Sequence, residues 1–169
     1  ILSGQRKFEE AAHLFQQALK VDPRSVVAHV NLGFARMNRE DMDGAMQSYS
    51  EALKLDPESP LANFYLGAIL ARIGNPDAAK PYLLKALEIQ PGWAMAHREL
   101  GLILARQKDL DGALVHFSEV VRVSPESAEA HFHLGLALAQ KGDREGGIRE
   151  FSEAVRLEPT SMKYVNYLE

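Results

Sequence analysis

The stretch AMAHRELGLILARQKDLDGALVHFSEVVRVSPES, residues 94–127, is one copy of a pattern that returns at a constant spacing along the chain. The prolines show this spacing most plainly, since five of the eight are evenly placed: Pro23, Pro57, Pro91, Pro125 and Pro159. A fixed period of this length is typical of repeat proteins. With each proline placed at position 32, the complete units run over 26–59, 60–93, 94–127 and 128–161.

Several other positions of the unit keep their chemical character. Position 7 is leucine and position 8 is glycine: Leu32 and Gly33, Leu66 and Gly67, Leu100 and Gly101, Leu134 and Gly135. Position 24 is bulky: Phe15, Tyr49, Leu83, Phe117 and Phe151. Positions 20 and 27 are small or short: Ala11, Ala45, Ala79, Ala113 and Gly147, then Ala18, Ala52, Ala86, Val120 and Ala154. Small residues let two antiparallel helices approach closely, and the bulky ones fill the space between them.

Each unit carries two helical patterns with a start signal before each. Serine precedes the first helix, over about positions 1–14, at Ser25, Ser59, Ser127 and Ser161. Position 16 precedes the second helix and carries Asp41, Asn75, Asp109 and Asp143. Both sets are residues that favour the N-cap of a helix. A single helix pair cannot bury its apolar face alone, so the pairs are expected to stack around a shared core.

This pattern resembles the tetratricopeptide repeat family, whose unit is a 34-residue helix–turn–helix. The resemblance implies an all-α fold, a right-handed superhelical solenoid of antiparallel helix pairs. The expected organisation is a partial N-terminal repeat over 1–25 (mainly its second helix), repeats over 26–59, 60–93, 94–127 and 128–161, and the start of a further or capping helix over 162–169. The chain is interpreted as a fragment of a longer protein.

Three features depart from the family pattern. Position 4, a large aromatic residue in the family, is polar here: His29, Asn63, His97 and His131. Position 15, often glycine, is Glu40 in one unit and Lys108 in another. Pro81 falls inside a second helix and is expected to kink or loosen it. None of these changes the predicted fold.

Composition narrows the function. The chain of 169 residues has 19 basic and 23 acidic residues, a net charge of −4, and no cysteine. A mildly acidic chain without a basic tract is a poor nucleic-acid binder, so no nucleic-acid partner is expected. No apolar run approaches the length of a membrane span, and no signal peptide is visible. The compartment stays open: the cytoplasm is favoured, and the lack of cysteine also fits the periplasm.

No constellation predicts catalysis, a metal or a cofactor. His131 and His133 are two residues apart on a helix and point to opposite faces, and His29, His97 and His131 fall on different helices. The runs beginning at Asp41 and Asp109 resemble the start of a calcium loop, but the twelfth position, which must be an acidic ligand, is Ala52 or Val120. The sequence therefore predicts a non-enzyme without a metal or cofactor.

The family resemblance also implies a concave peptide-binding groove, lined by positions 2, 5, 6, 9, 12 and 13 of the first helices. The candidate residues are Val27, Val30, Asn31, Phe34, Leu61, Phe64, Tyr65, Arg72, Met95, Arg98, Leu102, Arg106, Phe132 and His133. The family's carboxylate clamp of Lys and Asn is absent, because the corresponding residues include Val30, Phe34, Tyr65, Met95 and Glu99. The asparagine ladder at position 6 is absent too.

The predicted function is a non-catalytic protein–protein interaction scaffold. Its groove would bind an amphipathic helix or an extended apolar segment, with a carboxylate meeting Arg72, Arg98 and Arg106. Alternatively, part of the apolar stripe is core between repeats or is covered by further chain. This stripe consists of Val27, Val30, Phe34, Leu61, Phe64, Tyr65 and Met95. Trp93, just before a first helix, either anchors a partner or packs against its neighbour, and packing is favoured.

Two other functions stay open. The chain is a homo-oligomerising module if its open repeat ends pair, with an unpartnered apolar face on Met162, Tyr164, Val165, Tyr167 and Leu168. It is a docking or regulatory segment if it belongs to a larger enzyme.

Overall fold

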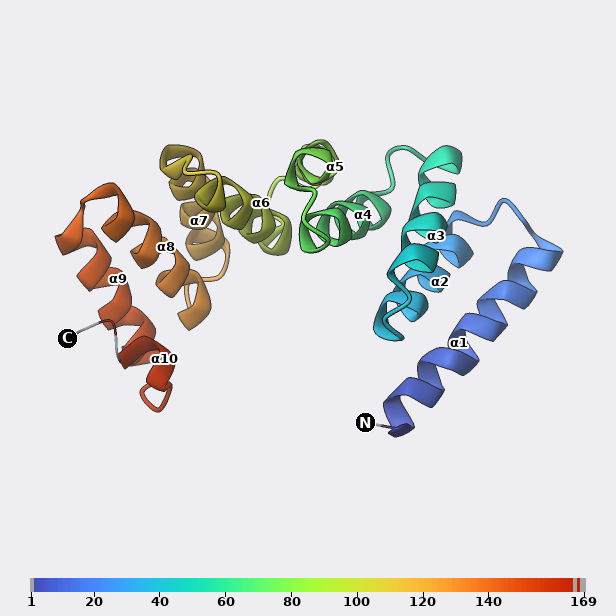
Figure 1. The fold of residues 1–169 in the computed structure, drawn as a ribbon, viewed down its shortest axis with the longest axis horizontal. Helices are drawn as coiled ribbons and strands as arrows, with labels where there is room; N and C mark the ends of the chain where they lie inside the picture. The colour runs from blue at the N-terminus through green and yellow to red at the C-terminus, as the bar shows by residue number, and fades with distance from the viewer. Residues whose placement is uncertain (1, 166, 168–169) are drawn as a thin grey trace. The chain divides into compact units, whose positions relative to one another are not determined.

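The computed structural model describes residues 2–165 and 167, and within that part of the chain the regular structure is entirely helical (Figure 1). The helices are α1 (Leu2–Val21), α2 (Val26–Asn38), α3 (Met42–Leu55), α4 (Pro60–Arg72), α5 (Pro76–Ile89), α6 (Ala94–Arg106), α7 (Leu110–Val123), α8 (Ala128–Lys141), α9 (Arg144–Leu157) and α10 (Met162–Val165). The chain divides into two compact units, unit 1 over Ile1–Gln90 and unit 2 over Pro91–Glu169. In unit 1, α2 packs on α3 and α4 on α5; in unit 2, α6 packs on α7 and α8 on α9. The predicted all-α fold of helix pairs is confirmed.

The second helix of every complete repeat begins at the predicted N-cap. The side chains of Asp41, Asn75, Asp109 and Asp143 each accept a hydrogen bond from the backbone N–H three residues later, over 2.8–3.3 Å. The first helices are less uniform. Ser25 and Ser127 accept the same bond, whereas Ser59 stands at the N-cap of α4 without a side-chain hydrogen bond.

The glycine at position 8 is where the two helices of a pair come closest. A Cβ atom on Gly33 would lie 2.8 Å from the Tyr49 ring, and one on Gly101 would lie 2.6 Å from the Phe117 ring. The small residues beside the contact are buried too, with Ala45 fully so. The predicted close packing of position 8 against position 24 is therefore confirmed.

The polar residue at position 4 ties each first helix to the loop before it. A side-chain nitrogen of position 4 lies 2.8–3.0 Å from the carbonyl oxygen of the proline six residues earlier, in the pairs His29–Pro23, Asn63–Pro57, His97–Pro91 and His131–Pro125. A nitrogen at this position satisfies a backbone acceptor that an aromatic hydrocarbon would leave unpaired. The departure from the family pattern thus has a structural role.

The other departures are also accommodated. Pro81 does not interrupt α5, which continues to Ile89. At position 15, Gly74 and Gly142 have positive φ, and so do Glu40 and Lys108, each with φ of 65°. The backbone of this turn is therefore left-handed in all four repeats, including the two where a side chain makes that conformation costly.

The two ends of the chain differ in how well they are covered. In α1, Phe15 is half-buried and Ala18 is exposed, whereas the equivalent Tyr49 and Ala52 are completely buried. At the other end, the Tyr164 and Tyr167 rings lie 5.2 and 5.0 Å from the Phe132 ring.

The expectation that the C-terminal apolar face lacks a partner is therefore wrong for Tyr164, which is buried against Phe132, whereas Tyr167 contacts the same ring but stays 50% exposed. Met162 is exposed, while Leu168 and the side chain of Val165 lie outside the described residues. No helix in the described part of the chain has the length and apolar character needed to cross a membrane.

Candidate binding surface

Some of the predicted groove residues are buried in the core, and others are exposed on the surface. Three of the four residues at position 5 of the first helices are buried, with Val30 7%, Phe64 5% and Phe132 4% exposed, while the fourth, Arg98, is half-buried. Their contacts place them in the core; the Phe132 ring, for example, lies 5.8 Å from the Phe151 ring. These three residues are thus the part of the apolar stripe that forms core, and they do not offer surface to a partner.

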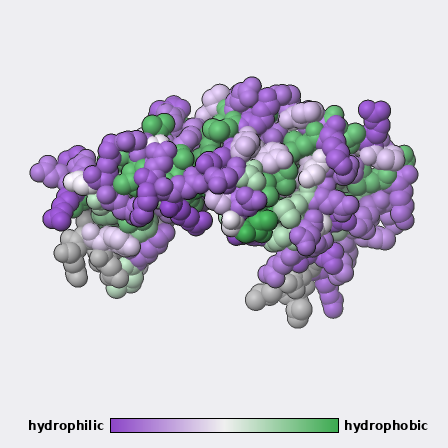
Figure 2. Space-filling model, turned by 45° about the horizontal axis from the view of Figure 1, so that its top comes forward, coloured by the Kyte–Doolittle hydropathy of each residue, from purple (hydrophilic) through white to green (hydrophobic). Residues whose placement is uncertain are grey.

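In unit 1, an apolar and aromatic surface remains on α2 and α4. Val27, Phe34 and Leu61 are exposed, and Asn31 and Tyr65 are half-buried. Figure 2 shows apolar atoms reaching the surface in patches bordered by polar side chains.

The aromatic part of this surface is well packed. The Phe34 ring lies 5.8 Å from the Tyr65 ring, which in turn stacks on Tyr49 at 5.4 Å with an interplanar angle of 16°. Burial raises the pKa of the Tyr49 phenol far above its usual value, and its hydroxyl has no hydrogen-bond partner among the described residues.

The three predicted arginines do not behave alike. Arg72 belongs to unit 1, is exposed, and donates a hydrogen bond to the sulfur of Met42. Arg98 belongs to unit 2 and is already paired, 3.0 Å from Glu99 and 3.7 Å from Glu129. A carboxylate of a partner would have to displace these acids, so Arg98 is a poor anion site.

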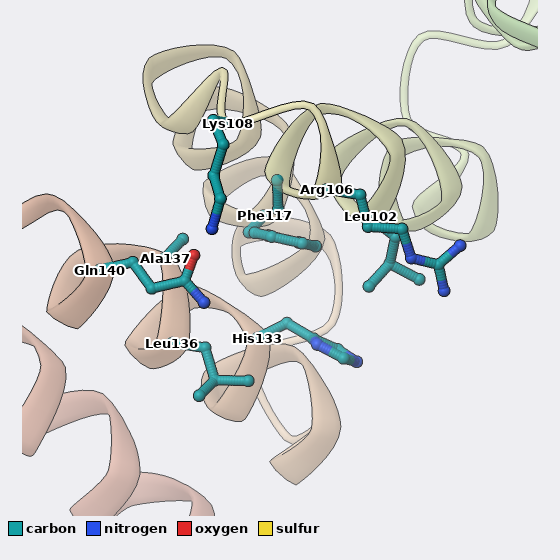
Figure 3. A pocket seen from close by; sticks show the side chains of 9 residues that line it. Leu102, Arg106, Lys108, Phe117, His133, Leu136, Ala137 and Gln140 are labelled. Atoms are coloured by element: carbon teal, nitrogen blue, oxygen red, sulfur yellow. The ribbon is translucent and has the colours of Figure 1, made fainter. Parts of the chain in front are cut away.

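Unit 2 has an open pocket of about 320 Å³ between α6, α7 and α8 (Figure 3). Its lining consists of Leu102, Ala105, Arg106, Lys108, Phe117, His133, Leu136, Ala137 and Gln140. The His133 ring stacks on Phe117, with centroids 5.5 Å apart and an interplanar angle of 16°. Burial lowers the pKa of His133, so this ring is neutral at neutral pH. The structure thus gathers three predicted groove residues, Leu102, Arg106 and His133, around one apolar hollow.

One polar residue of this pocket, Lys108, does not stand at a predicted groove position, whereas Gln140 stands at position 13, which is one of them. Figure 3 shows Lys108 and Gln140 on one side of the pocket and Arg106 beside Leu102 on the other. Lys108 occupies the turn at position 15, where the sequence showed only a departure from glycine. That departure was the available signal, but its relation to the groove depends on how the turn is folded.

Met95, the remaining predicted residue, is exposed on α6 and borders a second, smaller hollow with Arg98 and Glu129. Trp93 is half-buried at the N-cap of α6, and its carbonyl accepts the N–H of His97. Nearby, Nδ1 of His97 lies 2.9 Å from Nδ1 of His116, and burial lowers the pKa of His116. Among the described residues there is no group of three or more potential ligands that could hold a metal ion.

Stacked antiparallel helix pairs, each with a close contact between the glycine at position 8 and the bulky side chain at position 24, define a helical-repeat protein. Tetratricopeptide repeat models match residues 1–60, 37–100, 101–142 and 128–161, and the chain belongs to this family.

Among solved structures, the chain is similar to MamA, with 27% identity, a TM-score of 0.83, and coverage of 93% of this chain and 92% of that one. It is also similar to YrrB, described as a TPR protein with an unusual peptide-binding site, with 27% identity, a TM-score of 0.81, and coverage of 98% and 85%. MamA from Desulfovibrio magneticus RS-1 gives 25% identity, a TM-score of 0.82, and coverage of 92% and 88%. No curated protein matches the chain significantly. The family and these relatives support a protein-interaction scaffold.

Proposed function

We propose that the chain is a non-catalytic scaffold that binds a peptide or an amphipathic helix of another protein on the exposed faces of its first helices. The observation that carries the proposal is the apolar surface of α2 and α4, where Val27, Phe34 and Leu61 are exposed. Exposed apolar surface bordered by polar residues is typical of interaction sites. The peptide-binding site that YrrB is described as having supports the same function.

A peptide selection tests this function. A phage-displayed library is selected against the purified protein, and the enriched peptide is synthesised and its affinity measured. Leu61→Asp on α4 should weaken binding about tenfold, because a charge in an apolar contact must be desolvated without a partner. Leu84→Asp is the matched control, since Leu84 is exposed to a similar extent (53% against 46%) but lies on α5, a second helix.

Circular dichroism should show both variants folded. Equal binding by the Leu61→Asp variant and the unchanged protein would contradict the proposal, as would an equal loss in the control.

A second candidate function, self-association through open repeat ends, stays a prediction, because the exposed face of α1 belongs to a partial repeat. Phe15 and Ala18 stand at positions that are buried in every complete repeat, so another helix would bury them. Light scattering should then show a dimer that Ala18→Glu disrupts; a monomer at every concentration would contradict this function. The interpretation as a docking segment of a larger enzyme stays a prediction.

A further inference from the structure

We propose that the pocket of unit 2 recognises an acidic side chain next to a large apolar one, that is, an internal Asp or Glu beside Phe or Leu in a peptide of a partner protein. This inference rests on the proposed function, because it names what one part of the binding surface selects. The acidic group would meet Lys108 and Gln140, and the apolar group would pack on Leu102 and Leu136.

The charge of the pocket selects the acid. Of the residues that line it, Arg106 and Lys108 are cationic and none is acidic. Neither cation, nor the Gln140 amide, makes a hydrogen bond or ion pair with any described residue. The protein as a whole has a net charge of −4, so this is a local positive site on an acidic molecule. Exposed cations that have no partner among the described residues, beside an apolar surface, favour a carboxylate, which forms stronger hydrogen bonds than a neutral acceptor.

The neighbouring basic residues are already paired with acids, whereas Lys108 and Gln140 are not paired with any described residue. Lys141, one residue after Gln140, is paired with Asp111, and Arg98 is paired with Glu99 and Glu129. His133 is close to a carboxylate too, with its Nε2 atom 3.5 Å from Oε1 of Glu129. The cationic side of the pocket toward Lys108 has no such acid in its lining.

The volume and the apolar lining of the pocket favour the large apolar side chain that stands next to the acidic residue in the peptide. The pocket volume is about 320 Å³. Pockets that hold small molecules begin at roughly 300 Å³, so this pocket is a small one. It therefore suits one or two side chains, and a whole helix would have to lie over it. The faces of Leu102, Phe117 and Leu136 are apolar, so a large hydrocarbon side chain is buried there while the carboxylate stays at the edge.

The position of the pocket favours an internal residue of the partner. Met95, two turns before Leu102 on α6, is exposed and borders the second hollow with Arg98 and Glu129, so the hollowed surface continues past the pocket along the helix. A peptide can therefore cross the pocket rather than end in it. In the family, a clamp of Lys and Asn binds a terminal carboxylate. Arg106 and Lys108 stand at other positions of the repeat than the residues of that clamp.

The binding of three capped hexapeptides, acetylated and amidated so that their ends are neutral, tests the inference by NMR titration of the full chain. They carry Phe-Asp, Phe-Asn or Phe-phosphoserine at the centre. The Phe-Asp peptide should bind about tenfold more tightly than the Phe-Asn peptide, since the difference is one charge-assisted hydrogen-bond site. The amide signals of Lys108 and Gln140 should shift on binding.

The charge reversal Lys108→Glu should remove the preference for Phe-Asp over Phe-Asn. Glu40→Lys is the matched control, because Glu40 occupies the same position of an earlier repeat with the same φ of 65°. This control should leave the preference unchanged.

Equal affinity for Phe-Asp and Phe-Asn, no binding at millimolar peptide, or a preference that survives Lys108→Glu would each overturn the inference. Tighter binding of the phosphoserine peptide would overturn it in favour of a phosphate site. The library selection with Leu61→Asp has an independent outcome, so the scaffold function can stand where this inference fails.

Discussion

Unit 1 and unit 2 each contain the same kind of ring stack, but the residues around that stack give the two units different surfaces. In unit 1, Tyr65 at position 6 stacks on Tyr49 at position 24, at 5.4 Å and 16°. In unit 2, His133 stacks on Phe117 at the same two positions, at 5.5 Å and 16°. The repeated geometry shows that the stack belongs to the scaffold of the repeat. What differs is the chemistry placed around it.

The surrounding residues differ in size and charge. Unit 1 has Phe34 at position 9 and unit 2 has Leu102, and the Phe34 ring packs on Tyr65. At position 15, unit 1 has Glu40 and unit 2 has Lys108, with the same backbone φ. Unit 1 thus offers a packed aromatic surface and has an acid at position 15, whereas unit 2 offers an open pocket that the base at position 15 lines. Two repeats of one fold can in this way contact different parts of a partner.

The strongest test of the shared scaffold is to fill the close contact at position 8. Even a Cβ atom at Gly101 would lie 2.6 Å from the Phe117 ring. Gly101→Val should therefore destabilise unit 2 by about 3 kcal/mol, because a packed core resists added volume. Gly33→Val should destabilise unit 1 by a similar amount, because its side chain would clash with the Tyr49 ring. Hydrogen exchange over each unit measures both effects.

Gly92→Val is the control in unit 2, since a Cβ atom at Gly92 would have no neighbour within 4 Å. A small effect of Gly101→Val, equal to that of Gly92→Val, would show that the helix pair opens more easily than the close contact indicates.

The sequence could predict this scaffold because each of its positions recurs. Leucine and glycine at positions 7 and 8 and the N-cap at position 16 repeat with one spacing, so a local pattern specifies the helix pair. The part of Lys108 in the pocket could not be predicted in the same way, because it stands in a turn outside the groove positions and lines the pocket together with residues of the next repeat only after stacking. The burial of each apolar residue could not be predicted from the sequence either. Val27 and Val30 are both valines of α2, yet the structure shows that Val30 is buried and Val27 is exposed.

A smaller effect should come from exchanging the rings at position 24. The buried hydroxyl of Tyr49 has no hydrogen-bond partner among the described residues. Tyr49→Phe removes it and should stabilise unit 1 by about 1 kcal/mol. The reciprocal Phe117→Tyr should destabilise unit 2 by placing a hydroxyl in the equivalent buried place. Denaturant unfolding of both variants provides the measurement. If Tyr49→Phe lowers stability, the hydroxyl has a favourable interaction and the two positions are not equivalent.

The smallest effect should come from the turn at position 15, where the two units have opposite charges on one strained backbone. Glu40→Gly and Lys108→Gly should each stabilise the protein by about 0.5 kcal/mol, since relief of the left-handed conformation exceeds the entropy that glycine loses on folding. The gain should be equal in the two variants because both residues have φ of 65°. Their effect on binding should differ, because only Lys108→Gly removes a cation from the pocket and should weaken the Phe-Asp peptide. A loss of that binding in the Glu40→Gly variant as well would mean that the turn, and not its charge, controls recognition.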